Sequence, residues 1–391
     1  MATPLSDRES LDLAATIRHQ LTNVIDPELG LNIVELGMVG EIDVSQQGHA
    51  TISVALTTAA CPLRSQIEED VRRAIVSLVG VTEVTISIGQ LDAEAKATLM
   101  NIARKAAQRD APVTSIPLRT RILGIASGKG GVGKSSITVN VGVALARKGF
   151  TVGILDADIW GFSVPRLLGL DGPVEAHDKK MVPKKLHVGD GELRVLSMGF
   201  LAEEDQAIMW RGLILNRAVQ QFIEDAHWDD IDYLLIDLPP GTGDVQMGLA
   251  RLLPRTELLI VTTPPLAAQQ VAARAADMAR KGNLRVAGVI ENMSAFTCEH
   301  GETYALFGSG GGERLAASLG VPLLGSIPLD PSVVAGGDLG QPVAGGDTPL
   351  SAAFDQMATT IAEDVAPLRD VTGCSARMIE SLELALKESE R

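Results

Sequence analysis

A glycine-rich octapeptide places the tightest limit on how this chain can fold. The aliphatic stretch 122–127 is followed by Gly-Lys-Gly-Gly-Val-Gly-Lys-Ser at residues 128–135, where a helical pattern begins. This is a Walker A sequence in the strand–loop–helix context that it requires. Glycines let the backbone curl until its N–H groups point at phosphate oxygens, and the N-terminus of the next helix adds a positive dipole. The octapeptide therefore predicts a phosphate-binding loop that begins at Gly128.

Two side chains of this loop are expected to act on the phosphates. Lys134 is placed to neutralise charge on the β- and γ-phosphates, and the Ser135 hydroxyl is placed to hold Mg²⁺. The other loop positions would contact the nucleotide mainly through backbone N–H groups. The residues of this segment that we expect at the nucleotide are Gly128, Lys129, Gly130, Gly131, Val132, Gly133, Lys134, Ser135 and Ser136.

Beyond residue 121, aliphatic strand-like segments alternate with helical ones. The expected strands are 122–127, 151–156, 233–237, 257–263 and 285–291. Helices are expected between them, among others at 135–147 and 267–281. Such repetition implies right-handed crossovers, and a chain with only 3% aromatic residues suits the aliphatic core of buried parallel strands. We predict an α/β P-loop NTPase domain with a doubly wound, mostly parallel sheet.

The first 95 residues have a different pattern, which predicts a small α+β domain over residues 1–95. Apolar residues recur at helical spacing from Leu11 to Leu21 and from Ile67 to Leu78, and alternate as in strands at 52–56 and 84–88. An alanine-rich stretch and a segment with two prolines follow, so we assign residues 96–118 to a linker. Residues 119–365 are assigned to the P-loop ATPase domain. Residues 366–391 are assigned to a C-terminal helical tail.

Two acidic motifs follow expected strands. Asp156-Ala-Asp158-Ile-Trp-Gly ends the second strand, at the sheet edge where open α/β proteins bind their ligands. Leu-Ile-Asp237-Leu-Pro-Pro-Gly241-Thr-Gly-Asp ends a later one. Asp237 has the position of a Walker B carboxylate, which contacts the magnesium shell, and the Gly241 amide is placed to sense the γ-phosphate. These motifs predict a Mg²⁺-dependent ATP hydrolase.

The second lysine of the loop, Lys129, resembles the deviant Walker A box of the MinD/ParA/nitrogenase-iron-protein class of ATPases. The resemblance implies a homodimer in which this lysine reaches the partner's nucleotide. It also implies that Asp158 orients the attacking water, with Asp156 as the alternative, because hydrolysis needs a positioned acceptor for the water proton. The catalytic set expected from this class is Lys129, Lys134 and Asp158.

One further residue bears on which base the nucleotide carries. Asn292, in Glu-Asn-Met-Ser after the last expected strand, matches the residue whose amide meets adenine in this class. A guanine-reading Asn-Lys-x-Asp sequence is absent from the chain. We therefore expect ATP rather than GTP.

Together, the octapeptide, Asp-Ala-Asp-Ile-Trp-Gly, Trp-Arg-Gly at 210–212, Asp-Leu-Pro-Pro-Gly-Thr-Gly-Asp and Glu-Asn-Met-Ser resemble the Mrp/ApbC iron–sulfur cluster carrier ATPases over residues 119–340. The first unit is similar to the small iron–sulfur assembly domain often fused ahead of them, with Asp26-Pro-Glu and Thr-Thr-Ala-Ala-Cys61-Pro. The resemblance implies a carrier or scaffold that binds and hydrolyses ATP, holds an iron–sulfur cluster and delivers it to apo-proteins.

The chain departs from these relatives at the usual cluster site, a Cys-x-x-Cys pair soon after the Asn-Met-Ser segment. Here the sequence is Cys298-Glu-His300-Gly301, so the second cysteine position holds glycine. His300 could replace it, since mixed His/Cys ligation of a two-iron cluster exists, and Cys374 of the tail is another source. The alternative is a degenerate site. Cys61, just before an expected helix, is either an activated thiolate or a buried inert cysteine.

The amino-acid composition limits which classes of partner we expect for this chain. A formal net charge of −15 repels nucleic-acid phosphates and anionic lipid, so we expect neither as a partner. Three scattered cysteines suit a reducing compartment, and the first residues lack a signal-like pattern, so we expect the cytoplasm. Two alternatives remain open. One is a MinD/ParA-like positioning protein, and the other is an ATPase conformational switch without a cluster.

Overall fold

A computed structural model describes residues 5–26, 31–57, 64–76, 78–109, 114–117, 119–158, 161–178, 180–200, 212–241 and 244–368. It divides into two compact units, Met1–Asp110 and Ala111–Arg391, each of which is described by itself. None of the helices in these ranges is long and apolar enough to span a bilayer.

The first unit is a three-stranded sheet in the order β1-β2-β3, covered by helices. Its elements are α1 (Asp7–Gln20), β1 (Val39–Val44), β2 (His49–Leu56), α2 (Arg64–Ile75), β3 (Glu83–Gln90) and α3 (Ala93–Arg109). β1 and β2 are antiparallel, whereas β2 and β3 are parallel. The expected strands and the buried helix face of Ile67, Val71 and Ile75 are confirmed. The prediction that this helix extends to Leu78 is wrong, because α2 ends at Ile75 and Leu78 lies beyond its end.

Residues 96–109, assigned above to a linker, belong to helix α3. Alanine is the strongest helix former, and this helix contains six alanines in AEAKATLMNIARKAAQR. Leu99 and Ala103 are buried in the core of the first unit. The helix is therefore part of that unit's packing.

The second unit contains, within its described residues, an eight-stranded sheet in the order β15-β12-β11-β4-β10-β5-β9-β8. All neighbours are parallel except the edge pair β8 and β9. The strands of this sheet are β4 (Arg121–Ser127), β5 (Thr151–Asp156), β8 (Lys184–Val188), β9 (Gly191–Ser197), β10 (Tyr233–Asp237), β11 (Glu257–Thr262), β12 (Arg285–Asn292) and β15 (Leu323–Ile327). The predicted doubly wound sheet is confirmed.

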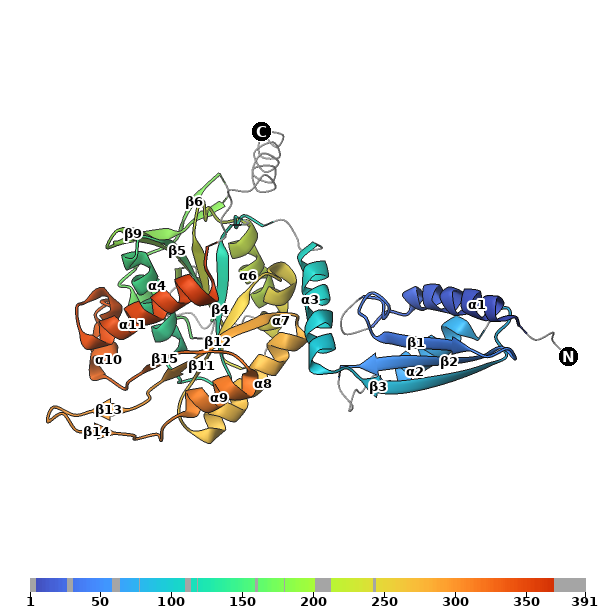
Figure 1. Ribbon diagram of the computed structural model, residues 1–391. Helices are drawn as coiled ribbons and strands as arrows, with labels where there is room; N and C mark the ends of the chain where they lie inside the picture. Colours follow the sequence, from blue (N-terminus) through green and yellow to red (C-terminus); the bar gives the residue numbers. More distant parts are fainter. Residues whose placement is uncertain are drawn as a thin grey trace. The chain divides into compact units, whose positions relative to one another are not determined.

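Helices cover both faces of this sheet (Figure 1). Residues of α4 (Lys134–Arg147) and α11 (Pro349–Thr360) share one core with the sheet. Residues of α6 (Gly212–Glu224), α7 (Asp244–Leu252), α8 (Leu266–Lys281) and α9 (Gly311–Leu319) share the other. Smaller elements are α5 (Val164–Leu167), α10 (Pro331–Asp338), β6 (Glu175–His177), β7 (Lys180–Val182), β13 (Phe296–Thr297) and β14 (Thr303–Tyr304).

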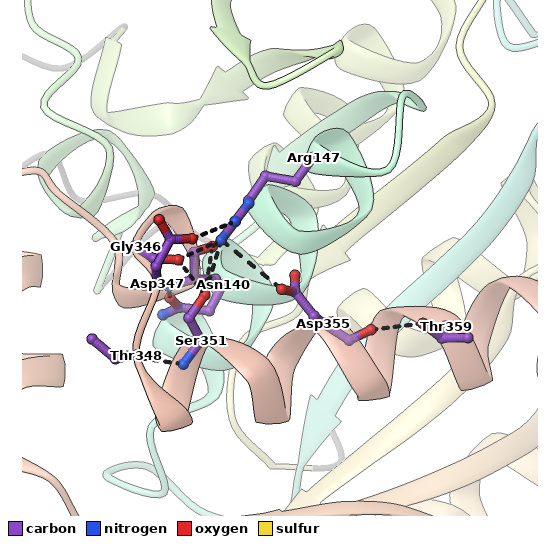
Figure 2. A network of polar contacts seen from close by, with 9 residues as sticks. Asn140, Arg147, Gly346, Asp347, Thr348, Ser351, Asp355 and Thr359 are labelled. Atoms are coloured by element: carbon purple, nitrogen blue, oxygen red, sulfur yellow. Dashed lines mark hydrogen bonds and ion pairs between the residues drawn. The ribbon is translucent and has the colours of Figure 1, made fainter.

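Helix α4, which carries the end of the glycine-rich loop, is enclosed on all sides. Every residue from Ile137 to Ala146 is buried. At its C-terminus the Arg147 guanidinium donates to the carbonyl oxygens of Ala344 at 2.7 Å and Gly346 at 2.6 Å, and to Ser351 Oγ at 2.9 Å (Figure 2). In the middle of the helix, Asn140 Oδ1 accepts the Ala344 N–H at 2.9 Å. These bonds fasten α4 to the segment before α11, so the loop at its N-terminus is held on a fixed support.

Candidate nucleotide-binding site

The loops that leave the carboxyl ends of β4, β5 and β10 meet around a pocket of about 280 Å³. The connection after β4 runs to one face of the sheet, whereas the connections after its neighbours β10 and β11 run to the other face. The pocket lies beside this switch point, which is the usual ligand position in such folds. The lining residues are Ser127, Lys129, Gly130, Gly131, Val132, Gly133, Lys134, Ser135, Ser136, Asp158, Gly161, Ser163 and Pro240. Most of the predicted nucleotide contacts are therefore brought together.

Backbone conformation or close packing requires glycine at three positions of the loop. Gly131 and Gly133 have φ of +77° and +79°, which L side chains rarely adopt. A Cβ at Gly128 would stand 2.3 Å from the carbonyl carbon of Val271 in α8, and one at Gly133 would stand 2.3 Å from Asn292 Nδ2. The loop is curled and packed against neighbouring backbone, as the octapeptide predicts.

Beneath the loop lies a buried polar centre on Asp237. Lys134 Nζ lies 2.6 Å from Asp237 Oδ1, with the two side chains 6% and 0% exposed. Ser135 Oγ donates to Asp237 Oδ2 at 2.5 Å. Thr138 Oγ1 donates to Oδ1 at 2.9 Å. A buried carboxylate is tolerated only when it is paired and hydrogen-bonded in this way. Sequence reasoning missed Thr138, although it is a hydroxyl one turn after Lys134 in an otherwise aliphatic run.

The two aspartates after β5 have different surroundings. Asp156 is fully buried, and its carboxylate accepts the N–H groups of Asp158, Ser163 and Val164 at 3.1, 3.2 and 3.3 Å. Burial, followed by the nearby Asp237 carboxylate, raises the pKa of Asp156 to about 7. Asp158 instead lines the pocket. This difference favours Asp158 over Asp156 as the group that meets a water molecule.

Three predicted residues lie at the margins of the pocket. The Lys129 side chain is exposed, and its ammonium has no ion-pair partner among the residues that the structure describes. The Gly241 N–H donates to Ser127 O at 2.9 Å, and Gly241 O accepts from Gln246 Nε2 at 3.0 Å. Asn292 is buried, and its Nδ2 donates to Val132 O at 2.9 Å. In this structure the Gly241 and Asn292 amides are thus engaged with the β4 end and the loop.

Cys298 lies elsewhere, at the tip of the β13–β14 hairpin (Figure 1). Its N–H donates to Glu302 O at 2.9 Å, and its carbonyl accepts the Gly301 N–H at 2.9 Å. Gly301 has φ of +84°, so the turn is built around a conformation that glycine adopts readily. The His300 side chain is exposed and 4.0 Å from Glu299. No group of three or more His, Cys, Asp or Glu side chains within the described ranges is arranged to hold a metal ion. Cys61 and Cys374 lie outside the described residues.

A Walker A loop on a doubly wound sheet, with a buried Walker B aspartate beneath it, defines a P-loop nucleotide-binding protein. Comparison with known families agrees. Residues 119–364 match the family described as the ParA, or NUBPL, iron-transfer P-loop NTPases, and residues 14–87 match the iron–sulfur cluster assembly proteins. The chain belongs to the NUBPL iron-transfer P-loop NTPase family.

Full-length relatives share both units. The iron–sulfur cluster carrier protein of Mycobacterium leprae is 43% identical over 349 residues, which cover 86% of this chain and 89% of the relative. The protein of the same name from Deinococcus radiodurans is 44% identical, covering 82% and 86% of the two chains. Among solved structures, a nucleotide-binding protein from Archaeoglobus fulgidus in complex with ADP is 33% identical, covers 61% of this chain and 90% of its own, and has a TM-score of 0.49.

Proposed function

We propose that this protein is a cytoplasmic, ATP-dependent iron–sulfur cluster carrier that binds and hydrolyses ATP and delivers clusters to apo-proteins. The proposal that the protein binds and hydrolyses ATP rests on the convergence of Lys134 and Ser135 on Asp237, directly under the glycine-rich loop. The proposal that the cargo is an iron–sulfur cluster rests on the names of the relatives and on the match of both units to iron–sulfur families.

The donor set fits a nucleotide with Mg²⁺. The loop offers backbone N–H groups and a helix N-terminus to the phosphates. Ser135 and Asp237 offer the hard oxygen ligands that Mg²⁺ prefers. When bound, the ion would neutralise charge that develops on the phosphates. Lys134 now pairs with Asp237 at 2.6 Å, so it has only to turn its ammonium toward the phosphates.

In the hydrolysis step, water attacks the γ-phosphorus and the bond to the β–γ bridging oxygen breaks, giving ADP and inorganic phosphate. Asp158 accepts a proton of that water. Lys129, which is exposed, completes the site of a second subunit in a homodimer. The Gly241 N–H would leave Ser127 O for the γ-phosphate, and Asn292 would meet the adenine.

The cargo is assigned to the β13–β14 hairpin. Cys298 supplies one thiolate per chain, and a homodimer brings two. A cluster held by four protein ligands then needs two more, for which His300 of each hairpin is the nearest candidate. Apo-proteins with free thiolates would receive the cluster.

Steady-state ATP hydrolysis by the wild type and by Lys134→Ala tests the nucleotide half. The variant should lose hydrolysis, and an unchanged rate would overturn the site assignment. A second candidate function is an ATPase switch without a cluster. It is favoured by Gly301, whose φ of +84° gives the hairpin a turn built for glycine. Iron and sulfide analysis after anaerobic reconstitution separates the two.

A further inference from the structure

Strand β9 ends at a buried serine that touches the nucleotide-binding edge. Ser197 is fully buried and lies opposite Asp156 in the parallel pairing of β5 with β9. Its Oγ donates to Asp156 Oδ2 at 3.1 Å. The same oxygen accepts the Gly199 N–H at 3.0 Å. One hydroxyl therefore joins the carboxylate after β5 to the backbone after β9.

The Asp156 carboxylate spans both ends of the loop that carries Asp158. Its Oδ1 accepts the Asp158 N–H near the start of the loop. Its Oδ2 accepts the N–H groups of Ser163 and Val164 at the end. Among the described residues, Ser197 supplies the side-chain donor to this carboxylate, and its other donors are the backbone N–H groups of Asp158, Ser163 and Val164. Ser197 thus fixes the carboxylate from outside the loop.

A second contact joins the same two segments. A Cβ at Gly199 would lie 2.6 Å from Cδ2 of Phe162, so the Phe162 ring packs directly over the backbone at Gly199. Phe162 belongs to the loop between Asp158 and α5, and Gly199 to the turn that follows β9. Loop and turn are therefore held together by a hydrogen-bond junction and by a ring packed on a glycine.

We infer that Ser197 is a positioning residue for hydrolysis, which orients Asp158, together with Ser163 and Val164, through the Asp156 carboxylate. This rests on the proposed ATP hydrolysis for its kinetic consequence, but the orientation of the loop is a property of the nucleotide-free chain. Removing the hydroxyl frees Asp156 Oδ2 to turn and leaves the Gly199 N–H unsatisfied. Neither Ser197 nor Gly199 lines the nucleotide pocket, so the glycine-rich loop is expected to keep its phosphate binding.

The test compares Ser197→Ala with a control, Ser326→Ala, at a serine that is exposed where Ser197 is buried. Ser326 Oγ also donates to a buried carboxylate, Glu291 Oε2, at 3.2 Å, but at the far side of the same sheet. With Mg²⁺ and ATP, Ser197→Ala should lower kcat about tenfold, with KM for ATP and Kd for ADP within about twofold of the wild type. Ser326→Ala should leave all three within about twofold. Gly199→Ala, which keeps the hydroxyl but displaces the Phe162 ring, should lower kcat about threefold.

Amide hydrogen exchange on the nucleotide-free protein gives a reading that does not need hydrolysis. Exchange at Asp158, Ser163 and Val164 should be at least about fivefold faster in Ser197→Ala and unchanged in Ser326→Ala. Unchanged exchange with normal kcat would overturn the inference. So would a loss of kcat and ADP affinity in the same proportion, with a drop in Tm, because that pattern marks a purely structural serine. If the wild type does not hydrolyse ATP, the proposed function fails, and the exchange result alone decides the role of Ser197.

Discussion

The nucleotide edge and the β13–β14 hairpin are built in opposite ways. At the edge, side chains converge on the buried carboxylate of Asp237, and backbone N–H groups with the Ser197 hydroxyl converge on that of Asp156, so that each accepts three or more hydrogen bonds. The hairpin consists of two strands of two residues each and carries Cys298 at an exposed tip. The first gathers the Walker A loop, Asp158 and the Asp237 centre from one chain, whereas the second offers a single cysteine.

The physical reason is the cost of burying charge. A carboxylate removed from water must be paired and hydrogen-bonded, so the fold has to bring its partners together before any ligand binds. Cys298, in a partly exposed hairpin turn, carries no such buried charge. The comparison teaches that the nucleotide site is preorganised, whereas the hairpin by itself provides no preformed set of metal ligands among the described residues.

The largest effect is expected for Lys134→Ala. It removes the phosphate-binding ammonium and leaves Asp237 buried without its counter-charge. Hydrolysis should fall below detection, and unfolding should be easier by about 3–5 kcal/mol. Lys129→Ala is the matched control for stability, since Lys129 is exposed, and its Tm should match the wild type. Equal Tm losses in the two variants would contradict the buried pair.

Asp158→Ala should separate binding from turnover. Loss of the proton acceptor should lower kcat about 100-fold or more, while Kd for ADP, measured calorimetrically, stays within a few-fold. Should this variant hydrolyse ATP normally, another group such as Asp156 must position the water, and the distinction drawn between the two aspartates would be wrong.

Gly128→Ala and Gly130→Ala test the packing of the loop. A Cβ at 128 would stand 2.3 Å from the backbone of Val271, whereas one at 130 would have only Pro240 Cγ at 3.9 Å. Overpacking of this kind costs about 1–3 kcal/mol, so Gly128→Ala should melt several degrees lower and Gly130→Ala close to the wild type. Thermal unfolding of the two proteins side by side decides the matter, and similar Tm values would refute this packing.

The smallest effect is expected at the hairpin. Gly301→Ala places a side chain at φ of +84°, with no atom within 4 Å of the new Cβ, so only backbone strain of about 1–2 kcal/mol is added. Hydrogen exchange should quicken at the tip, while ATP hydrolysis is unchanged. A loss of hydrolysis would show that the hairpin and the nucleotide edge are coupled.

Much of the nucleotide site follows from the sequence, because its parts are contiguous motifs that end parallel strands. The glycine-rich loop, Asp158 and the Asp237 centre lie where the motifs place them. Thr138 and Ser197 could not be found in this way. Thr138 is one hydroxyl within an aliphatic helix, and Ser197 lies 41 residues from Asp156. Their contact exists because β9 pairs with β5, and that strand order is invisible without the fold.

The C-terminal boundary of the first unit also could not be predicted from the sequence pattern. The alanine-rich stretch before residue 110 was assigned to a linker because it is polar, yet Leu99 and Ala103 are buried in that unit's core. A few apolar residues of α3, among them Leu99, Met100 and Ala103, decide its packing, and tertiary burial of this kind leaves only a weak trace in composition.

The most direct test of the account is anaerobic reconstitution with iron and sulfide, followed by transfer to an apo-protein with and without ATP. Wild type, Cys298→Ala and Cys61→Ala should be compared by bound iron, bound sulfide and visible spectrum. The account predicts a cluster on the wild type that ATP makes transferable, and its loss in Cys298→Ala. ATP hydrolysis without any bound cluster would contradict it, and would leave a switch ATPase on a carrier scaffold.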